Sequence, residues 1–158
     1  MTRSEFVVEV ERCQEDLRRF LTALCCGNTD MADDLAQDSL MKAYIALDSF
    51  RSQCLFKTWI FRIAYTTFIS SRRAVRPLEP IDAAASVAGA SRADDAFRNQ
   101  ALYAALQRLS EKERSAILLY YMQGYAVGEV AAITDSSEDA VKKLLSRGRS
   151  HLKDFLSE

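Results

Sequence analysis

The sequence predicts an all-α protein of two small helical domains joined by a flexible linker. Apolar residues recur at steps of three and four through most of the chain, which is typical of helices that bury one face. Glycine and proline are scarce, with 5 and 2 residues among 158, and strand-like alternation is weak. The length suits one domain or two small ones, and 49% of the residues are apolar, enough for packed cores.

We expect the first domain to span residues 1–76 and to contain three helices. The first runs from Ser4 to Cys26, and the second runs from Met31 to Leu47 with Asp30 as its N-cap. Residues 48–56 lose the periodicity and should form a loop. The third helix then covers residues 57–73.

The third helix combines basic and aromatic side chains and contains no acidic residue. One row of residues should face the core, and it comprises Phe56, Trp59, Ile60, Ile63, Ala64 and Thr67. A second row, Phe61, Tyr65, Phe68 and Arg72, points elsewhere. Rings stack on unpaired bases while cations follow the phosphates, so this second face suits a single nucleic-acid strand. A core helix with a solvated basic face is at least as consistent with this stretch taken alone.

Residues 77–94 are predicted to be the linker. They contain both prolines of the chain, Pro77 and Pro80, and many small residues without a clear apolar stripe. The alanines could support a short helix in a bound state. With few contacts crossing the linker, the two domains should take independent orientations.

The second domain, residues 95–158, should begin with a helix that ends near Leu109. Ser110 and Glu113 form a capping box that opens the next helix, and Gly124 ends it. A short helix over Val127–Ile133, a tight turn, and a longer helix over Glu138–Leu156 capped by Ser137 complete the domain.

The last two helices have the layout of a helix-turn-helix domain. Polar and basic residues lie on one side of the longer helix, namely Lys142, Lys143, Ser146, Arg147 and Arg149. In that layout the beginning of the second helix enters the major groove of DNA. A plain helical hairpin is the alternative, and it leaves this basic surface unexplained.

The net charge of −1, from 21 basic and 22 acidic residues, is unusual for a nucleic-acid-binding protein. The charges are segregated, however. Residues 30–48 and 78–95 are mainly acidic, whereas residues 50–76 and 141–153 carry only basic charges. Local charge governs docking, so the near-neutral sum does not exclude DNA.

Other chemistry finds little support in the sequence. The four cysteines, Cys13, Cys25, Cys26 and Cys54, form no C-x-x-C pair, and buried reduced thiols are expected. With one histidine and no glycine-rich phosphate loop, we expect no metal, no cofactor, no small-molecule substrate and no enzymatic activity. A polar N-terminus and the lack of an apolar run near the ~20 residues that span a bilayer predict a cytoplasmic protein.

Four stretches together resemble a known family over nearly the whole chain. They are D-D-L-A-Q-D-S-L-M-K-A-Y, D-S-F-R-S-Q-C-L-F-K-T-W-I-F-R-I-A, A-L-Q-R-L-S-E-K-E-R-S-A-I-L-L, and E-V-A-A-I followed by A-V-K-K-L-L-S-R-G-R. They are similar, in order, to the signatures of the extracytoplasmic-function (ECF) group of bacterial RNA polymerase sigma factors.

The resemblance implies a role for each surface. An alternative sigma factor binds RNA polymerase core and directs promoter recognition and opening, and many pair with an anti-sigma factor. Core polymerase would be bound by Asp34, Leu35, Gln37, Asp38 and Met41. The single strand of the −10 element would meet Phe50, Arg51, Lys57, Phe61, Arg62, Tyr65, Thr66, Arg72 and Arg73. The −35 duplex would meet Ser137, Lys142, Lys143, Ser146, Arg147 and Arg149.

The sequence departs from the family pattern at places that bear on DNA contacts. Thr66 stands where the family usually has Asn, Ser70 stands where it has Asp, and the turn over 134–137 lacks the usual glycine. The DNA sequence that the chain prefers therefore stays open. Two other functions are kept as alternatives, namely a stand-alone helix-turn-helix regulator that does not act through core polymerase, and a helical protein-interaction module.

Overall fold

The computed structural model describes residues 1–50, 54–75 and 93–157. Within these ranges every regular element is a helix, which confirms the all-α prediction. The predicted linker over 77–94 lies outside the described residues except for its last two, which already belong to the next helix. The domain boundaries therefore stay a prediction. In the part that the structure describes, no helix is long and apolar enough to cross a membrane.

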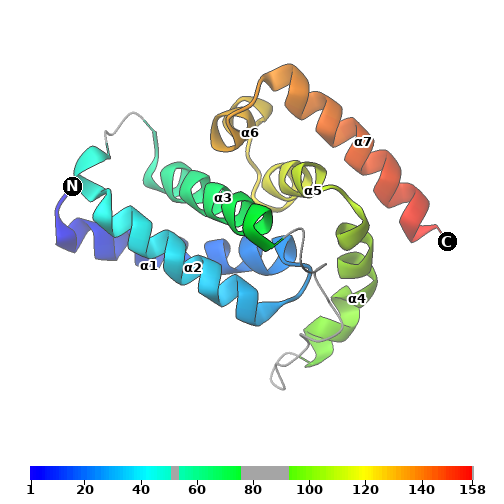
Figure 1. The fold of residues 1–158 in the computed structure, drawn as a ribbon, viewed down its shortest axis with the longest axis horizontal. Coiled ribbons are helices and arrows are strands. Elements are labelled where there is room, and N and C mark those ends of the chain that lie inside the picture. The colour runs from blue at the N-terminus through cyan, green and yellow to red at the C-terminus, as the bar shows by residue number, and fades with distance from the viewer. Residues whose placement is uncertain (51–53, 76–92, 158) are drawn as a thin grey trace.

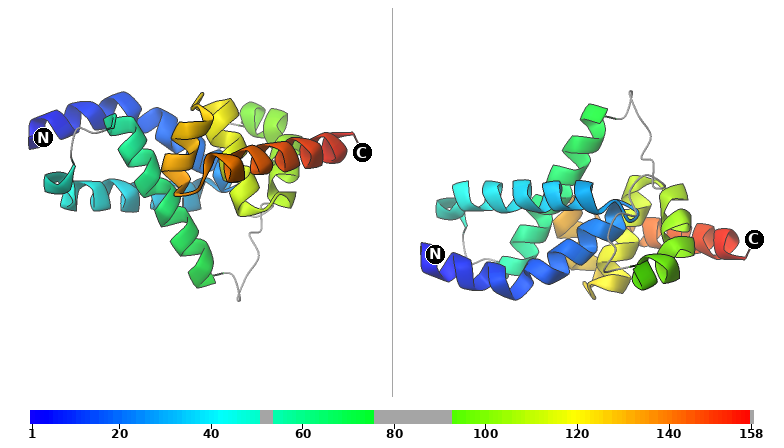
Figure 2. Two further views of the ribbon diagram at one scale, coloured as in Figure 1. Left: turned by 90° about the horizontal axis from the view of Figure 1, so that it is seen from above. Right: turned by 90° about the horizontal axis from the view of Figure 1, so that it is seen from below.

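Three helices form the N-terminal half: α1 (Arg3–Leu24), α2 (Thr29–Ile45) and α3 (Phe56–Val75). A single turn of 3₁₀ helix, η1 (Leu47–Ser49), follows α2. α1 and α2 run side by side in opposite directions, and α3 crosses both of them (Figures 1 and 2). The N-terminus and the C-terminus lie at opposite ends of the molecule (Figure 1).

The turn between α1 and α2 differs from the prediction. Cys26 and Gly27 both have a positive φ, of 55° and 92°, so the chain leaves α1 through a left-handed conformation. Asn28, not Asp30, is the N-cap of α2, and its side chain accepts a hydrogen bond of 3.0 Å from the N–H of Met31. Asp30 lies in the first turn instead, where its carboxylate still favours the helix dipole.

The C-terminal half contains α4 (Ala93–Arg108), α5 (Glu111–Ile117), a turn of π-helix η4 (Leu118–Met122), α6 (Val127–Thr134) and α7 (Glu138–Leu156). The predicted capping box is confirmed. The N–H of Glu113 donates to the Ser110 hydroxyl at 3.1 Å, and the Glu113 carboxylate accepts from the N–H of Ser110 at 3.4 Å. Ser137 caps α7 as expected, accepting a 3.1 Å hydrogen bond from the N–H of Ala140.

Gly148 allows α7 to lie unusually close to α5. A Cβ atom at this position would stand only 2.8 Å from Cγ1 of Ile117, which is closer than side chains approach one another. Val141 and Leu145 of the same helix are buried beside this contact. The α7 helix is thus held to the core by small and aliphatic residues along one face.

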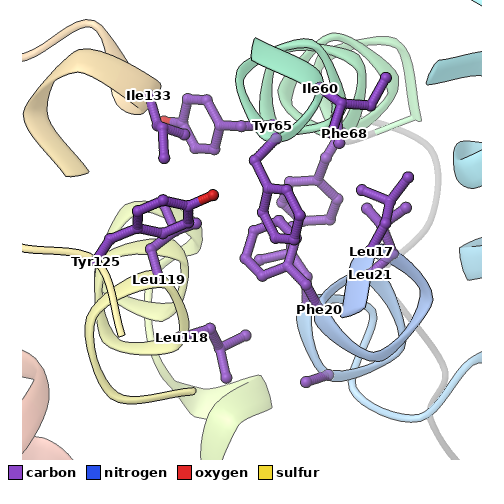
Figure 3. Close-up of a cluster of buried hydrophobic side chains, with 14 of the residues drawn as sticks. Leu17, Phe20, Leu21, Ile60, Tyr65, Phe68, Leu118, Leu119, Tyr125 and Ile133 are labelled. Atoms are coloured by element: carbon purple, nitrogen blue, oxygen red, sulfur yellow. The ribbon is translucent and has the colours of Figure 1, made fainter. Parts of the chain in front are cut away.

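The two halves pack against each other and do not orient independently, contrary to the expectation from the linker. α3 packs on α6, and α1 contacts α4, α5 and η4. Their buried side chains form one continuous core, in which Phe20 and Tyr65 of the N-terminal half lie opposite Leu118, Leu119 and Tyr125 of the C-terminal half (Figure 3). This shared core decides which surfaces of the molecule remain open.

Three of the four cysteines lie inside this core. Cys13, Cys25 and Cys26 are buried and free, as predicted, whereas Cys54 is exposed before the start of α3. Burial raises the pKa of the Cys13 thiol to about 11 and that of the Cys25 thiol to about 12. These two thiols therefore stay protonated and unreactive at neutral pH, because the thiolate is the nucleophile.

Candidate nucleic-acid interface

An open groove of about 420 Å³ lies between α2 and α3. It is lined by Lys42, Ala46, Trp59, Arg62, Ile63, Thr66 and Thr67. Arg62 and Thr66 were predicted to contact a single strand, and the structure places both on this groove. Lys42 and Trp59 were not predicted as site residues. The one signal for Lys42 was its position as the single basic residue of an otherwise acidic helix.

The groove joins an aromatic surface to two cations. Trp59 is only partly buried, although the sequence placed it in the core. Its ring centroid lies 4.9 Å from that of Phe50 and 5.8 Å from that of Phe56. Lys42 donates a 3.3 Å hydrogen bond to the Thr67 hydroxyl, which holds its ammonium group beside the groove. A ring flanked by cations can stack on a base and hold the adjacent phosphates.

Thr66 and Thr67 use their hydroxyls mainly within the helix. The Thr66 hydroxyl donates to the carbonyl of Arg62 at 2.9 Å, and the Thr67 hydroxyl donates to that of Ile63 at 2.7 Å. Thr66 is exposed, so its hydroxyl oxygen can still accept a hydrogen bond from outside the protein. A Thr at this position thus offers fewer donors to a base than the amide of Asn.

The second row of α3, which was predicted to face a strand, is buried. Phe61 and Phe68 have no exposed surface, and Tyr65 is 9% exposed. The Phe61 ring lies 5.2 Å from Phe20 and 5.9 Å from Tyr125, between centroids. Burial raises the pKa of the Tyr65 hydroxyl, and so does the nearby carboxylate of Glu111. The second row is therefore covered from both sides, by Phe20 of α1 and by Tyr125 of the C-terminal half, whereas Trp59 and Ile63 of the predicted core row line the open groove.

The basic residues of this region fall into two groups. Arg62 and Arg73 are exposed, whereas Lys57 and Arg72 are paired with carboxylates. Lys57 lies 2.8 Å from Asp16 of α1, and Arg72 lies 3.1 Å from Glu111 of α5. A paired cation attracts a phosphate less than a free one does, since its charge is already balanced. The predicted contact residue Arg51 lies outside the described residues.

The acidic face of α2 is open to solvent. Asp34, Gln37, Asp38 and Met41 are exposed, as a docking role requires. Leu35, predicted as part of the same contact, is instead buried in the core at 4% exposure and offers its side chain to no partner in this arrangement. Leu35 belongs with Ala32, Ala36, Ser39 and Ala43 to the buried side of α2, which borders the exposed acidic face.

The apolar part of the α2 surface is larger than predicted. Ile45 is 75% exposed and Met41 is 63% exposed, one helical turn apart. Exposed apolar side chains beside acidic ones are typical of a protein-binding surface. Ile45 was not predicted as part of this surface, because it lies at the end of the helix next to the predicted loop.

The basic side of α7 is exposed along its length. The predicted residues Lys142, Lys143, Ser146, Arg147 and Arg149 are all exposed. Arg149 donates a 3.0 Å hydrogen bond to the Tyr121 hydroxyl of η4, a contact the sequence did not indicate. The Ser137 hydroxyl already accepts the hydrogen bond that caps the helix. It can still offer DNA its O–H as a donor and one further acceptor site.

The turn that leads into α7 reaches its shape without glycine. Asp135 has a φ of 53° and a ψ of 50°, the left-handed conformation that ends α6. Asp tolerates this conformation better than most residues because its short polar side chain bonds locally. The hydroxyls of Thr134 and Ser136 lie 2.7 Å apart and close the turn from the other side. The turn is therefore formed without glycine, by Asp135 in the left-handed conformation and by this pair of hydroxyls.

Within the described ranges, no group of three or more His, Cys, Asp or Glu side chains could hold a metal ion. His151 lies on α7 with its Nδ1 atom 3.2 Å from the carboxylate of Glu113. The same carboxylate caps α5, so His151 is part of the packing between α5 and α7.

Comparison with known proteins agrees with this division of the chain into two halves. Residues 10–77 match the family Sigma-70 region 2, and residues 99–152 match the family Sigma-70, region 4. The first range contains the groove and the acidic face of α2, and the second contains α7. The fold is thus that of a transcription initiation factor of the Sigma-70 class.

The relatives narrow the class further. The chain is 32% identical over 144 residues to the ECF RNA polymerase sigma factor EcfG of Rhodopseudomonas palustris, with 89% of this chain and 78% of EcfG covered. It is 29% identical over 147 residues to the ECF RNA polymerase sigma factor SigW of Bacillus subtilis, with 84% and 79% covered. The chain belongs to the ECF RNA polymerase sigma factors.

Two solved structures, one of them described as a sigma factor, share the fold of the whole chain. The sigma factor RpoE of Bartonella quintana, in complex with the anti-sigma factor NepR, matches with a TM-score of 0.78, 29% identity and 97% of both chains covered. CnrH, in complex with the cytosolic domain of CnrY, matches with a TM-score of 0.75, 26% identity, and 99% and 90% covered. Because both matches span α1 to α7, the way the two halves pack is shared as well.

Proposed function

We propose that this protein is an alternative sigma factor that docks on RNA polymerase core through α2, holds the −10 strand at the groove between α2 and α3, and reads the −35 duplex with α7. The observation that carries the proposal is the open groove, where Trp59, Arg62 and Lys42 offer a stacking surface and two cations. It lies in the part of the chain that matches Sigma-70 region 2, directly beside the exposed acidic face.

Each surface contributes a different kind of contact. The carboxylates and the exposed Met41 and Ile45 of α2 suit a basic and partly apolar protein surface. The groove suits an unpaired base, whose removal from the duplex costs a few kcal/mol and can be offset by stacking. The exposed cations of α7 suit the phosphates and base edges of a duplex.

The partners and the setting follow from this role. RpoE and CnrH were each solved with a protein partner, an anti-sigma factor in the case of RpoE. We propose that this chain also binds an anti-sigma factor, in addition to core polymerase and promoter DNA. The polymerase performs the chemistry of transcription, so the protein itself is not an enzyme and needs no cofactor. Its place of action is the cytoplasm, where polymerase and chromosome meet.

Run-off transcription tests the proposed function directly. Purified core RNA polymerase is incubated with fragmented genomic DNA of the source bacterium, with and without the protein, and the 5′ ends of the transcripts are sequenced. We expect discrete start sites that require the protein and share two upstream sequence elements. If the protein binds DNA but yields no such transcripts, a stand-alone helix-turn-helix regulator becomes the better account.

The salt dependence of duplex binding tests the role of α7. If Lys142, Lys143, Arg147 and Arg149 make about four phosphate contacts, log K against log salt should fall with a slope near −3 to −4. Lys143→Ala should reduce this slope by roughly one. Fluorescence anisotropy with a 30-base-pair duplex measures it. Lys153→Ala, in the last turn of the same helix, is the matched control and should leave the slope unchanged. An equal reduction by both variants would mean that the charge of the whole helix matters, not a docked face.

A further inference from the structure

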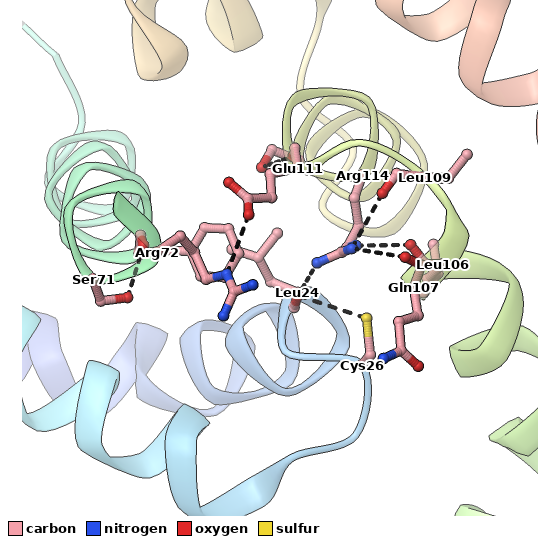
Figure 4. A network of polar contacts seen from close by, with 11 residues as sticks. Leu24, Cys26, Ser71, Arg72, Leu106, Gln107, Leu109, Glu111 and Arg114 are labelled. Atoms are coloured by element: carbon pink, nitrogen blue, oxygen red, sulfur yellow. Dashed lines mark hydrogen bonds and ion pairs between the residues drawn. The ribbon is translucent and has the colours of Figure 1, made fainter. Parts of the chain in front are cut away.

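Arg72 and Arg114, which bond to other helices, are buried, whereas Arg149 is open to solvent. Arg72 and Arg114 are 7% and 4% exposed, and they bond to Glu111 and to main-chain carbonyls inside the protein (Figure 4). Arg149 of α7 is exposed, and its Nη1 atom donates a 3.0 Å hydrogen bond to the hydroxyl of Tyr121 in η4. A neutral hydroxyl does not balance the charge of a guanidinium, so Arg149 keeps its attraction for an anion.

The packing of α7 on α5 explains why Tyr121 and Arg149 meet. Ile117 of α5 lies against Gly148, where a Cβ atom would stand only 2.8 Å from Cγ1 of Ile117. Tyr121 comes about one helical turn after Ile117, and Arg149 follows Gly148 directly. Because Gly148 has no side chain, α7 comes close enough to η4 for the two side chains to bond.

Tyr121 is held in place although it is 55% exposed. Its ring stands edge-on to that of Tyr120, with 4.9 Å between the centroids and 83° between the planes. Tyr120 itself packs against the core. The π-helical turn η4, which carries both rings, is closed by a 3.1 Å hydrogen bond from the N–H of Gln123 to the carbonyl of Leu118. Turns of this kind are rare and often lie at functional sites.

Both side chains have hydrogen-bonding capacity left for a ligand. A guanidinium has several N–H donors, and the bond to Tyr121 uses one of those of Arg149. The Tyr121 oxygen accepts this bond, so its own O–H can still donate. Donation from a cation polarises the hydroxyl and makes it a stronger donor. The pair thus offers N–H donors, an O–H donor and a positive charge, a combination that suits the oxygens of a phosphate.

We propose that Tyr121 and Arg149 form a phosphate clamp, which binds the sugar–phosphate backbone of duplex DNA beside α7. The clamp extends the DNA-binding surface from α7 onto η4. The hydroxyl of Tyr121 has two tasks in it: it orients the guanidinium of Arg149, and it donates a hydrogen bond of its own to the same phosphate. An arginine that is oriented beforehand loses less rotamer freedom on binding, which favours the complex.

The choice of duplex DNA as the ligand rests on the proposed function and on the position of Arg149. Lys142, Ser146 and Arg149 follow one another at steps of four and three, so they lie in one row along the exposed side of α7. In a helix-turn-helix domain the beginning of the second helix reads the bases. Arg149 lies in the second half of α7, so it should meet the backbone at the edge of the groove.

A double-mutant cycle on duplex binding tests the clamp. The full-length protein is titrated, without polymerase, against a fluorescein-labelled 30-base-pair duplex of mixed sequence at about 50 mM salt, because phosphate contacts do not depend on sequence. Tyr121→Phe removes only the hydroxyl and should weaken binding about three- to tenfold. In the Arg149→Ala background the same change should weaken binding less than about twofold, because the two side chains act as a unit. Absence of duplex binding by the wild type, equal affinities of Tyr121→Phe and the wild type, or additive losses each overturn the clamp.

The salt dependence separates the hydroxyl from the cation. Arg149→Ala removes a charge that displaces a counterion, so the slope of log K against log salt should fall in magnitude by roughly one. Tyr121→Phe removes a neutral donor and should lower the affinity at every salt concentration without changing the slope. An unchanged slope in Arg149→Ala overturns the phosphate contact.

Tyr44→Phe is the matched control, because it removes the hydroxyl of another exposed tyrosine, on α2 in the N-terminal half. It should bind the duplex like the wild type, and a loss equal to that of Tyr121→Phe overturns the clamp. Thermal unfolding followed by circular dichroism should show Tm values within about 2 °C of the wild type for both variants, since exposed positions contribute little to stability. The binding assay contains no polymerase, so failure of run-off transcription and failure of the clamp are separate results.

Discussion

Phe61→Ala should lower the free energy of unfolding by about 3–5 kcal/mol, the usual cost of removing a large aromatic side chain from a packed core. The Phe61 ring has no exposed surface and touches Phe20 on one side and Tyr125 on the other. Its loss therefore opens a cavity between the two halves. Urea denaturation followed by circular dichroism gives the free energy.

Trp59→Ala should cost less stability than Phe61→Ala, although Trp is the larger residue. Trp59 is partly exposed on the groove and contacts mainly Phe50 and Phe56. Its removal should instead reduce run-off transcription in protein that remains folded. Thr66→Ala, at an exposed position of the same helix, is the control for stability and should stay within about 0.5 kcal/mol of the wild type. A larger loss of stability from Trp59→Ala than from Phe61→Ala would contradict this assignment of the two faces.

Asp38→Arg should weaken binding to RNA polymerase core by about 2–5 kcal/mol if Asp38 pairs with a buried cation of the partner. That range corresponds to roughly 30-fold to 4000-fold in Kd. Asp38 is exposed on α2 beside Gln37 and Met41, so the substitution should leave the fold intact. Titration of labelled protein with core polymerase measures the change.

Glu11→Arg provides the matched control for Asp38→Arg. It reverses a charge on α1, at an exposed position outside the acidic face of α2, and should change the Kd less than threefold. Equal affinities of Asp38→Arg and the wild type would exclude the acidic face as the docking surface. Equal losses in both variants would show that the polymerase senses the overall charge of the protein and not this face.

Local signals in the sequence were enough to predict the helices and several of their ends. Two helix starts were predicted from short local patterns, the capping box of Ser110 and Glu113 and the N-cap Ser137. The structure contains both caps. The exception was the start of α2. Asp30 and Asn28 are both good caps, and the choice depends on the left-handed turn at Cys26 and Gly27, which no local pattern revealed.

The candidate site was predicted less completely, because contacts between residues far apart in the sequence decide which of its side chains are exposed and unpaired. The period of α3 showed that Phe61 and Tyr65 share a face, but a period does not say what covers that face. The carboxylates that pair with Lys57 and Arg72 lie 41 and 39 positions away along the chain. The groove was missed in part for the same reason, since Lys42 reaches it only through the crossing of α2 and α3.

The close contact between Gly148 and Ile117 has a consequence for how such a protein can change during evolution. The side of α7 that carries Gly148, Val141 and Leu145 fixes the helix to the core and tolerates little variation. The opposite side, with Lys142, Lys143 and Arg147, takes no part in that packing. Under the proposed role of this side in duplex binding, substitutions there would change the preferred promoter while the fold is retained. Promoter preference and stability would then be separately heritable properties of a single helix.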